Sequence, residues 1–130
     1  MSFSPCSHCA LLVDDDAGVL LALKMLMKSM GWEYVGASNA KVALERLGER
    51  SYGVAIIDIN MPGASGIELC RLIHLNDNKP VPVVLMLSGL VDPKVCEEAR
   101  MAGATAVLSK PIGRQEMIDE FRRHGLPCCS

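Results

Sequence analysis

Long blocks of a single charge are missing from this sequence, and so are long uninterrupted apolar runs. Thirteen Lys and Arg residues stand against fifteen Asp and Glu residues, for a formal net charge of -2, and the longest run of one charge is the aspartate triplet at 14–16. A basic stripe or patch is the usual footprint of nucleic-acid binding, so no direct nucleic-acid partner is expected.

A secretory signal and a membrane span are missing as well. The short apolar stretch at 10–13 has no basic segment before it and runs directly into three aspartates, unlike a signal peptide. The apolar stretch at 19–30 is interrupted by Lys24 and Lys28, which is typical of an amphipathic helix rather than a bilayer-spanning segment. We therefore expect no membrane association, and a cytoplasmic location is the default.

Short apolar runs predict five strands. Those at 10–13, 54–57 and 83–87 do not alternate with polar residues, as in strands buried on both faces of a parallel sheet, and weaker runs lie at 34–37 and 104–108.

A helix is predicted after each strand. The residues that set the helical period of the first three are Leu23, Leu26, Met27 and Met30, then Ala40, Ala43, Leu44 and Leu47, then Leu69, Leu72 and Ile73. Two further helices are predicted at about 93–102, with Asp92 as N-cap, and at about 114–124. Met25, like Met27 and Met30, is expected to fill gaps against the sheet.

This alternation of strands and helices predicts the fold class. Half of the 130 residues are hydrophobic, which is enough for one sizeable core. Five strand–helix units with short, right-handed connections predict an α/β fold, a doubly wound three-layer sandwich around a parallel five-stranded sheet. We expect a single domain over residues 1–130, with its core at about 10–124 and short cysteine-containing tails.

Polar residues gather just after four of the predicted strands. Ligands and reacting groups in such folds lie beyond the carboxyl ends of the strands, so these residues are the candidate site. They are Asp14 and Asp15 after the first strand, Asp58 and Asn60 after the third, Ser88 and Gly89 after the fourth, and Lys110 and Pro111 after the fifth.

The chemistry of these side chains points to phosphoryl transfer. Three carboxylates at one sheet edge repel each other unless a cation compensates, and oxygen ligands favour a hard divalent ion, Mg²⁺ or Mn²⁺ in its place. Lys110 and the Ser88 hydroxyl add a cation and a hydrogen-bond donor, which can hold phosphoryl oxygens around a carboxylate nucleophile such as Asp58.

Four segments resemble the receiver domains of two-component response regulators, the CheY-like family. They are Val-Asp-Asp-Asp at 13–16, Asp-Ile-Asn-Met-Pro-Gly at 58–63, Leu-Ser-Gly at 87–89 and Leu-Ser-Lys-Pro at 108–111. The resemblance extends over about residues 10–123, and it implies a flavodoxin-like sheet with strand order 2-1-3-4-5.

The resemblance implies a phosphoacceptor function for Asp58. This carboxylate would attack the phosphohistidine of a sensor histidine kinase or of a histidine phosphotransfer protein. Asp15, Asp58 and the Asn60 carbonyl would bind Mg²⁺, with Asp14 acting mostly through water. Lys110 would pair with Asp58 and then with the phosphoryl group.

The resemblance also implies how the signal would be passed on. Ser88 would turn toward the phosphoryl group, and the Lys110–Pro111 peptide bond would be cis. The protein would catalyse only its own phosphorylation and dephosphorylation, not the turnover of a substrate. An unknown downstream protein would bind through the face of the fourth helix, fifth strand and fifth helix, and the protein would be a monomer or a weak homodimer.

One position departs from the family pattern, and two others bear on the lifetime of the phosphoryl group. Val107 stands where receivers usually have an aromatic residue coupled to the Ser or Thr, so the aromatic part of the switch is missing. Asn60 stands two residues after Asp58 and Leu90 two residues after Ser88, where the family tunes hydrolysis of the phosphoryl group. An apolar side chain cannot orient water, so slow hydrolysis is expected.

Other interpretations remain for single features. Asp14 and Asp15 could simply favour a helix N-terminus, and Asp58 could open a turn. A metal-dependent phosphatase would need a second acid where Asn60 stands, and a flavin-binding module would be repelled by the aspartate triplet. A degenerate receiver that serves only as an adaptor is the nearest rival, and Val107 slightly favours it.

The terminal cysteines carry a weaker hypothesis. The six cysteines are too sparse for a disulfide scaffold, so reduced thiols are expected. Cys6 and Cys9 look like half of a zinc site, and the sheet would bring Cys128 and Cys129 to the same end of the molecule. Adjacent cysteines seldom both reach one ion, so oxidation-prone or disordered tails are favoured over zinc.

Overall fold

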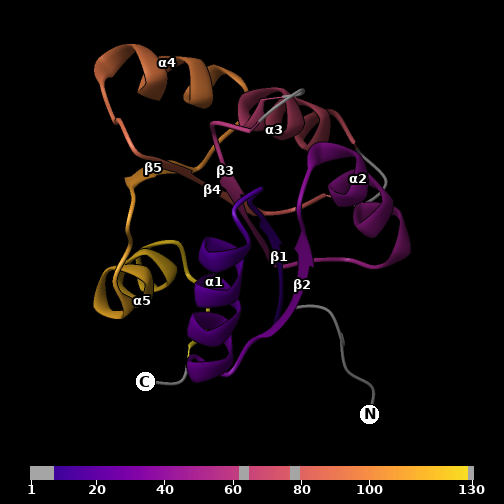
Figure 1. Ribbon diagram of the computed structural model, residues 1–130, viewed down its shortest axis with the longest axis vertical. Coiled ribbons are helices and arrows are strands. Elements are labelled where there is room, and N and C mark those ends of the chain that lie inside the picture. The colour runs from indigo at the N-terminus through magenta and orange to yellow at the C-terminus, as the bar shows by residue number, and fades with distance from the viewer. Residues whose placement is uncertain (1–7, 62–64, 77–79, 129–130) are drawn as a thin grey trace.

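A central parallel sheet organises the structure, a computed structural model that describes residues 8–61, 65–76 and 80–128. The strands lie in the order β2-β1-β3-β4-β5 (Figure 1), which confirms the predicted fold class and strand order. Their bounds are β1 (Cys9–Val13), β2 (Glu33–Ala37), β3 (Val54–Asp58), β4 (Val83–Ser88) and β5 (Ala106–Ser109).

Helices cover both faces of the sheet. One face carries α1 (Ala17–Ser29) and α5 (Arg114–Arg123), and the other carries α2 (Ala40–Glu49), α3 (Gly66–Leu75) and α4 (Pro93–Met101). Because both faces are covered, β1, β3 and β4 are buried along their whole length, which explains their unalternated apolar sequences.

Short polar side chains begin four of the five helices. The Asp16 carboxylate accepts hydrogen bonds from the amides of Gly18 and Val19 at 2.8 and 3.2 Å and so caps α1. Asn39, Ser65 and Asp92 cap α2, α3 and α4 in the same way, and Asp92 is the predicted cap.

Two core clusters lie on opposite sides of the sheet. On the α1 and α5 side, Trp32 packs edge-on against Phe121, with ring centroids 5.1 Å apart, and both side chains are buried. The indole N–H of Trp32 donates a hydrogen bond of 2.6 Å to the Pro127 carbonyl. This bond ties the segment after α5 to the core.

Three predicted core residues are exposed instead. Met25, Leu44 and Leu72 are 65%, 42% and 41% exposed, so their assignment to the core was wrong. Met25 is two positions from both Leu23 and Met27, which places it on the far side of α1. The other two are each one position from a fully or nearly buried neighbour and therefore point about 100° away from the sheet.

The fifth strand begins later than predicted. The run at 104–108 suggested its bounds, but the Ala104 amide bonds the Ala99 carbonyl at 3.0 Å and so belongs to the end of α4. The sheet pairing of β5 starts at Ala106, opposite Leu85.

The described cysteines do not support a shared zinc site. Cys9 is buried in the core cluster beneath α2 and α3, whereas Cys128 packs against the cluster beneath α1 and α5, on the other side of the sheet. Cys6 and Cys129 lie outside the described residues. In the described part of the chain, no helix combines the length and the apolar composition that crossing a membrane requires.

Candidate functional site

The carboxyl ends of the strands bring the predicted acids and the lysine together. Asp58 is the last residue of β3, and Asp14 and Lys110 directly follow β1 and β5. Parallel pairing of β1 with β3 and of β3 with β4 aligns these strand ends at one edge of the sheet. The residues therefore meet although almost one hundred positions separate the first from the last.

Lys110 lies between two buried carboxylates. Its Nζ is 2.8 Å from Asp14 Oδ2 and 3.2 Å from Asp58 Oδ1. The side chains of Asp14 and Asp58 are 1% and 5% exposed, so water hardly solvates their negative charges. The ammonium group of Lys110 compensates these charges instead. The sequence suggested the contact with Asp58 but not the shorter one with Asp14.

Burial and the neighbouring charges both shift the pKa values of Asp58 and Lys110. Burial, followed by the neighbouring charge of Asp14, raises the pKa of Asp58 above its ordinary value, and Lys110 only partly offsets this rise. For Lys110, burial favours the neutral amine, but its hydrogen bonds and ion pairs with Asp14 and Asp58 outweigh burial and raise its pKa. The lysine is therefore a permanent cation at neutral pH.

The acid cluster fits a hard divalent cation. One carboxylate oxygen each from Asp14, Asp15 and Asp58 lie within 4.8 Å of one another, and Asp15 is exposed to solvent. An all-oxygen set of this kind suits Mg²⁺ or Mn²⁺. Asp14 already has protein partners on both oxygens, since Oδ1 accepts the Asp16 amide at 2.9 Å, which favours Asp15 and Asp58 as direct ligands.

Asn60 is placed by Asp58 itself. The Asn60 amide donates a hydrogen bond of 3.2 Å to Asp58 Oδ1, which keeps the chain after β3 close to the acid cluster. Pro62 and Gly63 lie outside the described residues.

Ser88 ends β4, and its hydroxyl is turned toward the following loop. Ser88 Oγ donates to the Leu90 carbonyl at 2.7 Å and accepts from the Leu90 amide at 3.1 Å. We call this pair of bonds the Ser88 lock. Gly89, between the two residues, faces open space, and Leu90 is 67% exposed.

The fifth strand supplies the remaining predicted residues. Val107 is half-buried on β5, and the bond between Lys110 and Pro111 is cis, which confirms that prediction. Pro111 turns the chain from β5 toward α5.

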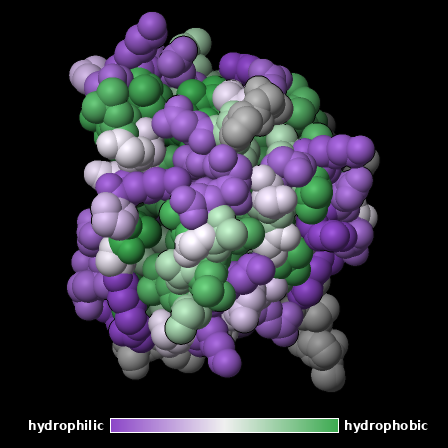
Figure 2. All heavy atoms as spheres, viewed as in Figure 1, coloured by the Kyte–Doolittle hydropathy of each residue, from purple (hydrophilic) through white to green (hydrophobic). Residues whose placement is uncertain are grey.

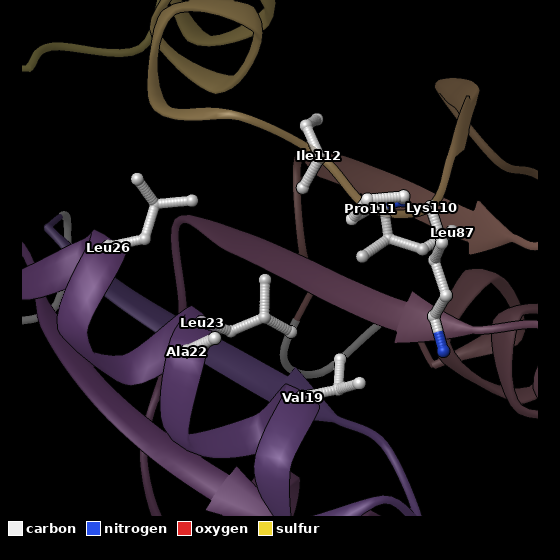
Figure 3. A pocket seen from close by; sticks show the side chains of 8 residues that line it. All are labelled: Val19, Ala22, Leu23, Leu26, Leu87, Lys110, Pro111 and Ile112. Atoms are coloured by element: carbon white, nitrogen blue, oxygen red, sulfur yellow. The ribbon is translucent and has the colours of Figure 1, made fainter.

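An apolar hollow of about 290 Å³ adjoins this cluster (Figure 3). It is lined by Val19, Ala22, Leu23 and Leu26 of α1, by Leu87, and by Lys110, Pro111 and Ile112. Apolar side chains also gather over α1 on the outer surface (Figure 2), where Leu21 and Met25 are 58% and 65% exposed. Sequence patterns do not reveal this hollow, because it forms between residues of α1, of β4 and of the segment after β5 that are far apart in the chain.

Gly66 is a site residue that sequence reasoning missed. A Cβ at this position would lie 2.0 Å from the carbonyl oxygen of Asp58 and 2.9 Å from Cα of Ile59. The first turn of α3 therefore rests directly on the backbone that carries the phosphoacceptor candidate. A glycine immediately after the Ser65 cap is the only sequence signal of this close approach.

Replacing Asp58 with Asn is expected to stabilise the protein at pH 7 when no divalent cation is present. Since the pKa of Asp58 is raised in the folded state, that state holds the proton more tightly than the unfolded chain. Stability therefore falls as pH rises through the interval from the ordinary value of 3.8 to the raised one, and the ionised group costs stability above it. Asn removes this cost, while Asp14 still pairs with Lys110.

Urea unfolding measures the effect directly. The midpoint of Asp58→Asn should exceed that of the wild type at pH 7, and the gap should close as the pH falls toward 3.8. Asp119→Asn, at an exposed position of α5, should show no such gap. A variant less stable than the wild type at pH 7 would contradict the expected cost of ionising Asp58 in the folded protein.

Comparison with known proteins gives consistent matches. The sequence model of the family described as the response regulator receiver domain matches residues 10–122 of this chain. Response regulator protein FleR of Pseudomonas aeruginosa is 37% identical over 89% of this chain and 24% of its own length. Response regulator protein TmoT of Ectopseudomonas mendocina is 32% identical over 85% of this chain and 50% of its own length. The chain thus spans half or less of these relatives.

Solved structures agree in fold. Chemotaxis protein CheY4 of Vibrio cholerae superposes with a TM-score of 0.84 at 25% identity, over 88% of this chain and 96% of that one. A receiver domain from Clostridium thermocellum has a TM-score of 0.78 at 28% identity, over 89% of this chain and 92% of that one.

Proposed function

Because the chain belongs to the response regulator receiver domain family, we propose that it is a switch whose phosphoacceptor is Asp58. The donor would be a sensor histidine kinase or a histidine phosphotransfer protein, and the phosphorylated form would change its binding to a downstream protein. The observation that carries the proposal is the position of Lys110, which contacts both Asp14 and Asp58 at the mouth of the acid cluster.

The transfer step uses the side chains at the strand ends. A carboxylate oxygen of Asp58 attacks phosphorus and forms the new O–P bond, while the N–P bond of phosphohistidine breaks. Its electron pair stays on the imidazole, which takes a proton from solvent. Lys110 donates from its ammonium group to a phosphoryl oxygen while it retains Asp14, and Ser88 Oγ donates to a second oxygen once its bonds to Leu90 are released.

Asp15, Asp58 and the Asn60 carbonyl are the residues that would hold Mg²⁺ or Mn²⁺, with Asp14 acting through water. The bound cation supplies charge compensation for the phosphoryl oxygens. The proposal of a bound cation is supported by the close approach of one carboxylate oxygen each from Asp14, Asp15 and Asp58. The protein's own contribution is to hold these like-charged acids close together, and the positive charge of Lys110 offsets the repulsion between Asp14 and Asp58.

The donor protein must reach Asp58 past the surface beside Lys110. The apolar hollow at Pro111 and Ile112, together with exposed Leu21 and Met25 of α1, offers apolar contact area at that approach. We propose that the donor protein docks on this apolar surface of α1 and the hollow beside it. We further propose that residues 1–130 form a single receiver domain with its core at about 10–124. It would act in the cytoplasm as a monomer or weak homodimer and catalyse only its own modification.

Intact-mass analysis tests the function. After incubation with Mg²⁺ and acetyl phosphate, the wild type should gain one phosphoryl group, and the same sample with excess chelator should gain none. Asp58→Asn should stay unmodified under both conditions. If Asp58→Asn gained a phosphoryl group to the same extent as the wild type, the acceptor would be another residue. If neither protein were modified by acetyl phosphate or by a phosphorylated donor, the adaptor alternative would be favoured.

A further inference from the structure

A pocket lies at the end of the sheet opposite Asp58, where the segment before β1 meets the segment after α5. It encloses about 140 Å³. His8 directly precedes β1, and Cys128 follows α5, so residues from nearly opposite ends of the chain form one site. The lining, which we call the terminal pocket, consists of His8, Met30, Gly31, Trp32, Pro127 and Cys128.

The buried side chain of Trp32 positions both segments. The His8 ring packs edge-on against the Trp32 ring, with centroids 5.6 Å apart, and the His8 carbonyl accepts the Glu33 amide at 2.9 Å. The indole N–H of Trp32 donates to the Pro127 carbonyl at 2.6 Å, which fixes the residue before Cys128. One aromatic side chain therefore holds an imidazole and a thiol at the same pocket.

The donor atoms of His8 and Cys128 are available to a ligand. Cys128 is a free, partly buried cysteine. His8 is exposed, and within the described part of the chain its side chain makes a ring contact with Trp32 while its ring nitrogens bond no other group. A thiolate and an imidazole are ligands for soft and borderline metal ions, unlike the oxygen cluster at the other end of the sheet.

The surroundings of the terminal pocket favour a cation. Helix α1 ends at Ser29, and its C-cap Met30 and the next residue, Gly31, line the pocket, so the negative end of the α1 dipole faces it. Among the described lining residues, none is a lysine or an arginine. Lys28, in the last turn of α1, is exposed and does not line the pocket.

The number and the softness of the donors select the kind of ion. Structural zinc takes four ligands in a tetrahedron, whereas the described lining offers one histidine and one cysteine. Mg²⁺ and Ca²⁺ prefer oxygen ligands. Cu(I) prefers soft donors, thiolate above all, and is stable with as few as two of them. The donor set of the terminal pocket therefore fits Cu(I).

We infer that the terminal pocket binds one Cu(I) ion between a ring nitrogen of His8 and Sγ of Cys128. Binding replaces the thiol proton, which passes to the buffer, and copper keeps its oxidation state. The bound ion joins the residue before β1 to the segment after α5. The site involves neither Cys9, which lies across the sheet, nor the acid cluster at Asp58, and it does not depend on phosphorylation.

Competition with a chromophoric Cu(I) chelator, under anaerobic conditions with ascorbate as reductant, tests the site in the full chain. Cys128→Ser and His8→Gln should each weaken Cu(I) binding at least about tenfold, because each removes one of two ligands. The controls are Cys96→Ser on α4 and His74→Gln on α3, which should change the affinity less than about twofold. An equal loss in Cys96→Ser would show adventitious thiol binding and overturn the inference.

Two further thiols provide a second control. Cys6 and Cys129 are near His8 and Cys128 in sequence but lie outside the described residues. If Cys6→Ser or Cys129→Ser abolished binding while Cys128→Ser and His8→Gln still bound Cu(I) fully, the ion would not occupy the terminal pocket and the inference would be wrong.

NMR of the ¹⁵N-labelled protein locates the ion, because Cu(I) is diamagnetic. Cu(I) should shift the amides of Gly31 and Cys128 and the indole N–H of Trp32, and it should leave the amide of Gly89 in place. Asp58→Asn should show the same shifts and the same affinity, which separates the terminal pocket from the acid cluster. Spectra of the metal-free variants report whether they are folded. Shifts at Gly89 without shifts at Gly31 and Trp32 would overturn the inference.

Discussion

Replacing Lys110 with Met should slow phosphorylation of Asp58 by about 100- to 1000-fold, the usual effect of removing one preorganised charge from a reacting site. Met keeps most of the aliphatic length that lines the hollow beside Pro111 but cannot contact Asp14 or Asp58 as a cation. The two buried carboxylates then repel each other directly. The incoming phosphoryl group also loses a donor for one of its oxygens.

Rates of phosphoryl gain from acetyl phosphate at saturating Mg²⁺ measure this effect. Lys41→Met, an exposed position on α2, is the control and should react at the wild-type rate. Thermal unfolding of both variants shows whether a slow reaction reflects lost folding instead. A folded Lys110→Met protein with a rate within about threefold of the wild type would remove the lysine from the transfer step.

A single added methyl group at Gly66 is expected to have the largest effect on stability. The Cβ of Gly66→Ala would lie 2.0 Å from the Asp58 carbonyl oxygen and 2.8 Å from the carbonyl carbon. Neither backbone atom can turn aside like a side chain, so α3 or the end of β3 must move. We expect a loss of about 3 kcal/mol or more in the free energy of unfolding.

The same substitution at Gly48 provides the control. A Cβ there meets nothing within 4 Å, and the residue lies within α2, so alanine should stabilise the protein by up to about 1 kcal/mol. Urea unfolding compares the two variants, and phosphoryl gain reports whether Asp58 keeps its place in Gly66→Ala. If Gly66→Ala is as stable as the wild type, the close approach of α3 to Asp58 is wrong.

Sequence spacing predicted the sheet and the meeting of its strand-end residues well. Unalternated apolar runs predict parallel strands, and parallel strands bring their carboxyl ends to one edge whatever the length of the helices between them. For that reason Asp58 and Lys110 could be placed together without coordinates. The strand order itself came from the family resemblance.

Contacts that depend on side-chain direction could not be predicted in the same way. The shorter ion pair of Lys110 is with Asp14, because the lysine crosses the end of β3 to reach the end of β1. The lock between Ser88 and Leu90 depends on the torsion of one hydroxyl-bearing side chain. Met25 looked like a core residue because α1 is apolar on most of its surface, and periodicity is then a weak guide.

The buried indole of Trp32 gives the protein an optical signal of its own. The chain has one tryptophan, packed edge-on against Phe121 and bonded to Pro127. Its intrinsic fluorescence therefore reports a single environment, formed jointly by the end of α1, helix α5 and the segment after it. Trp32 immediately precedes β2, so it lies at the amino end of the sheet, opposite Asp58. Emission spectra can thus follow unfolding of every variant described above without an added dye.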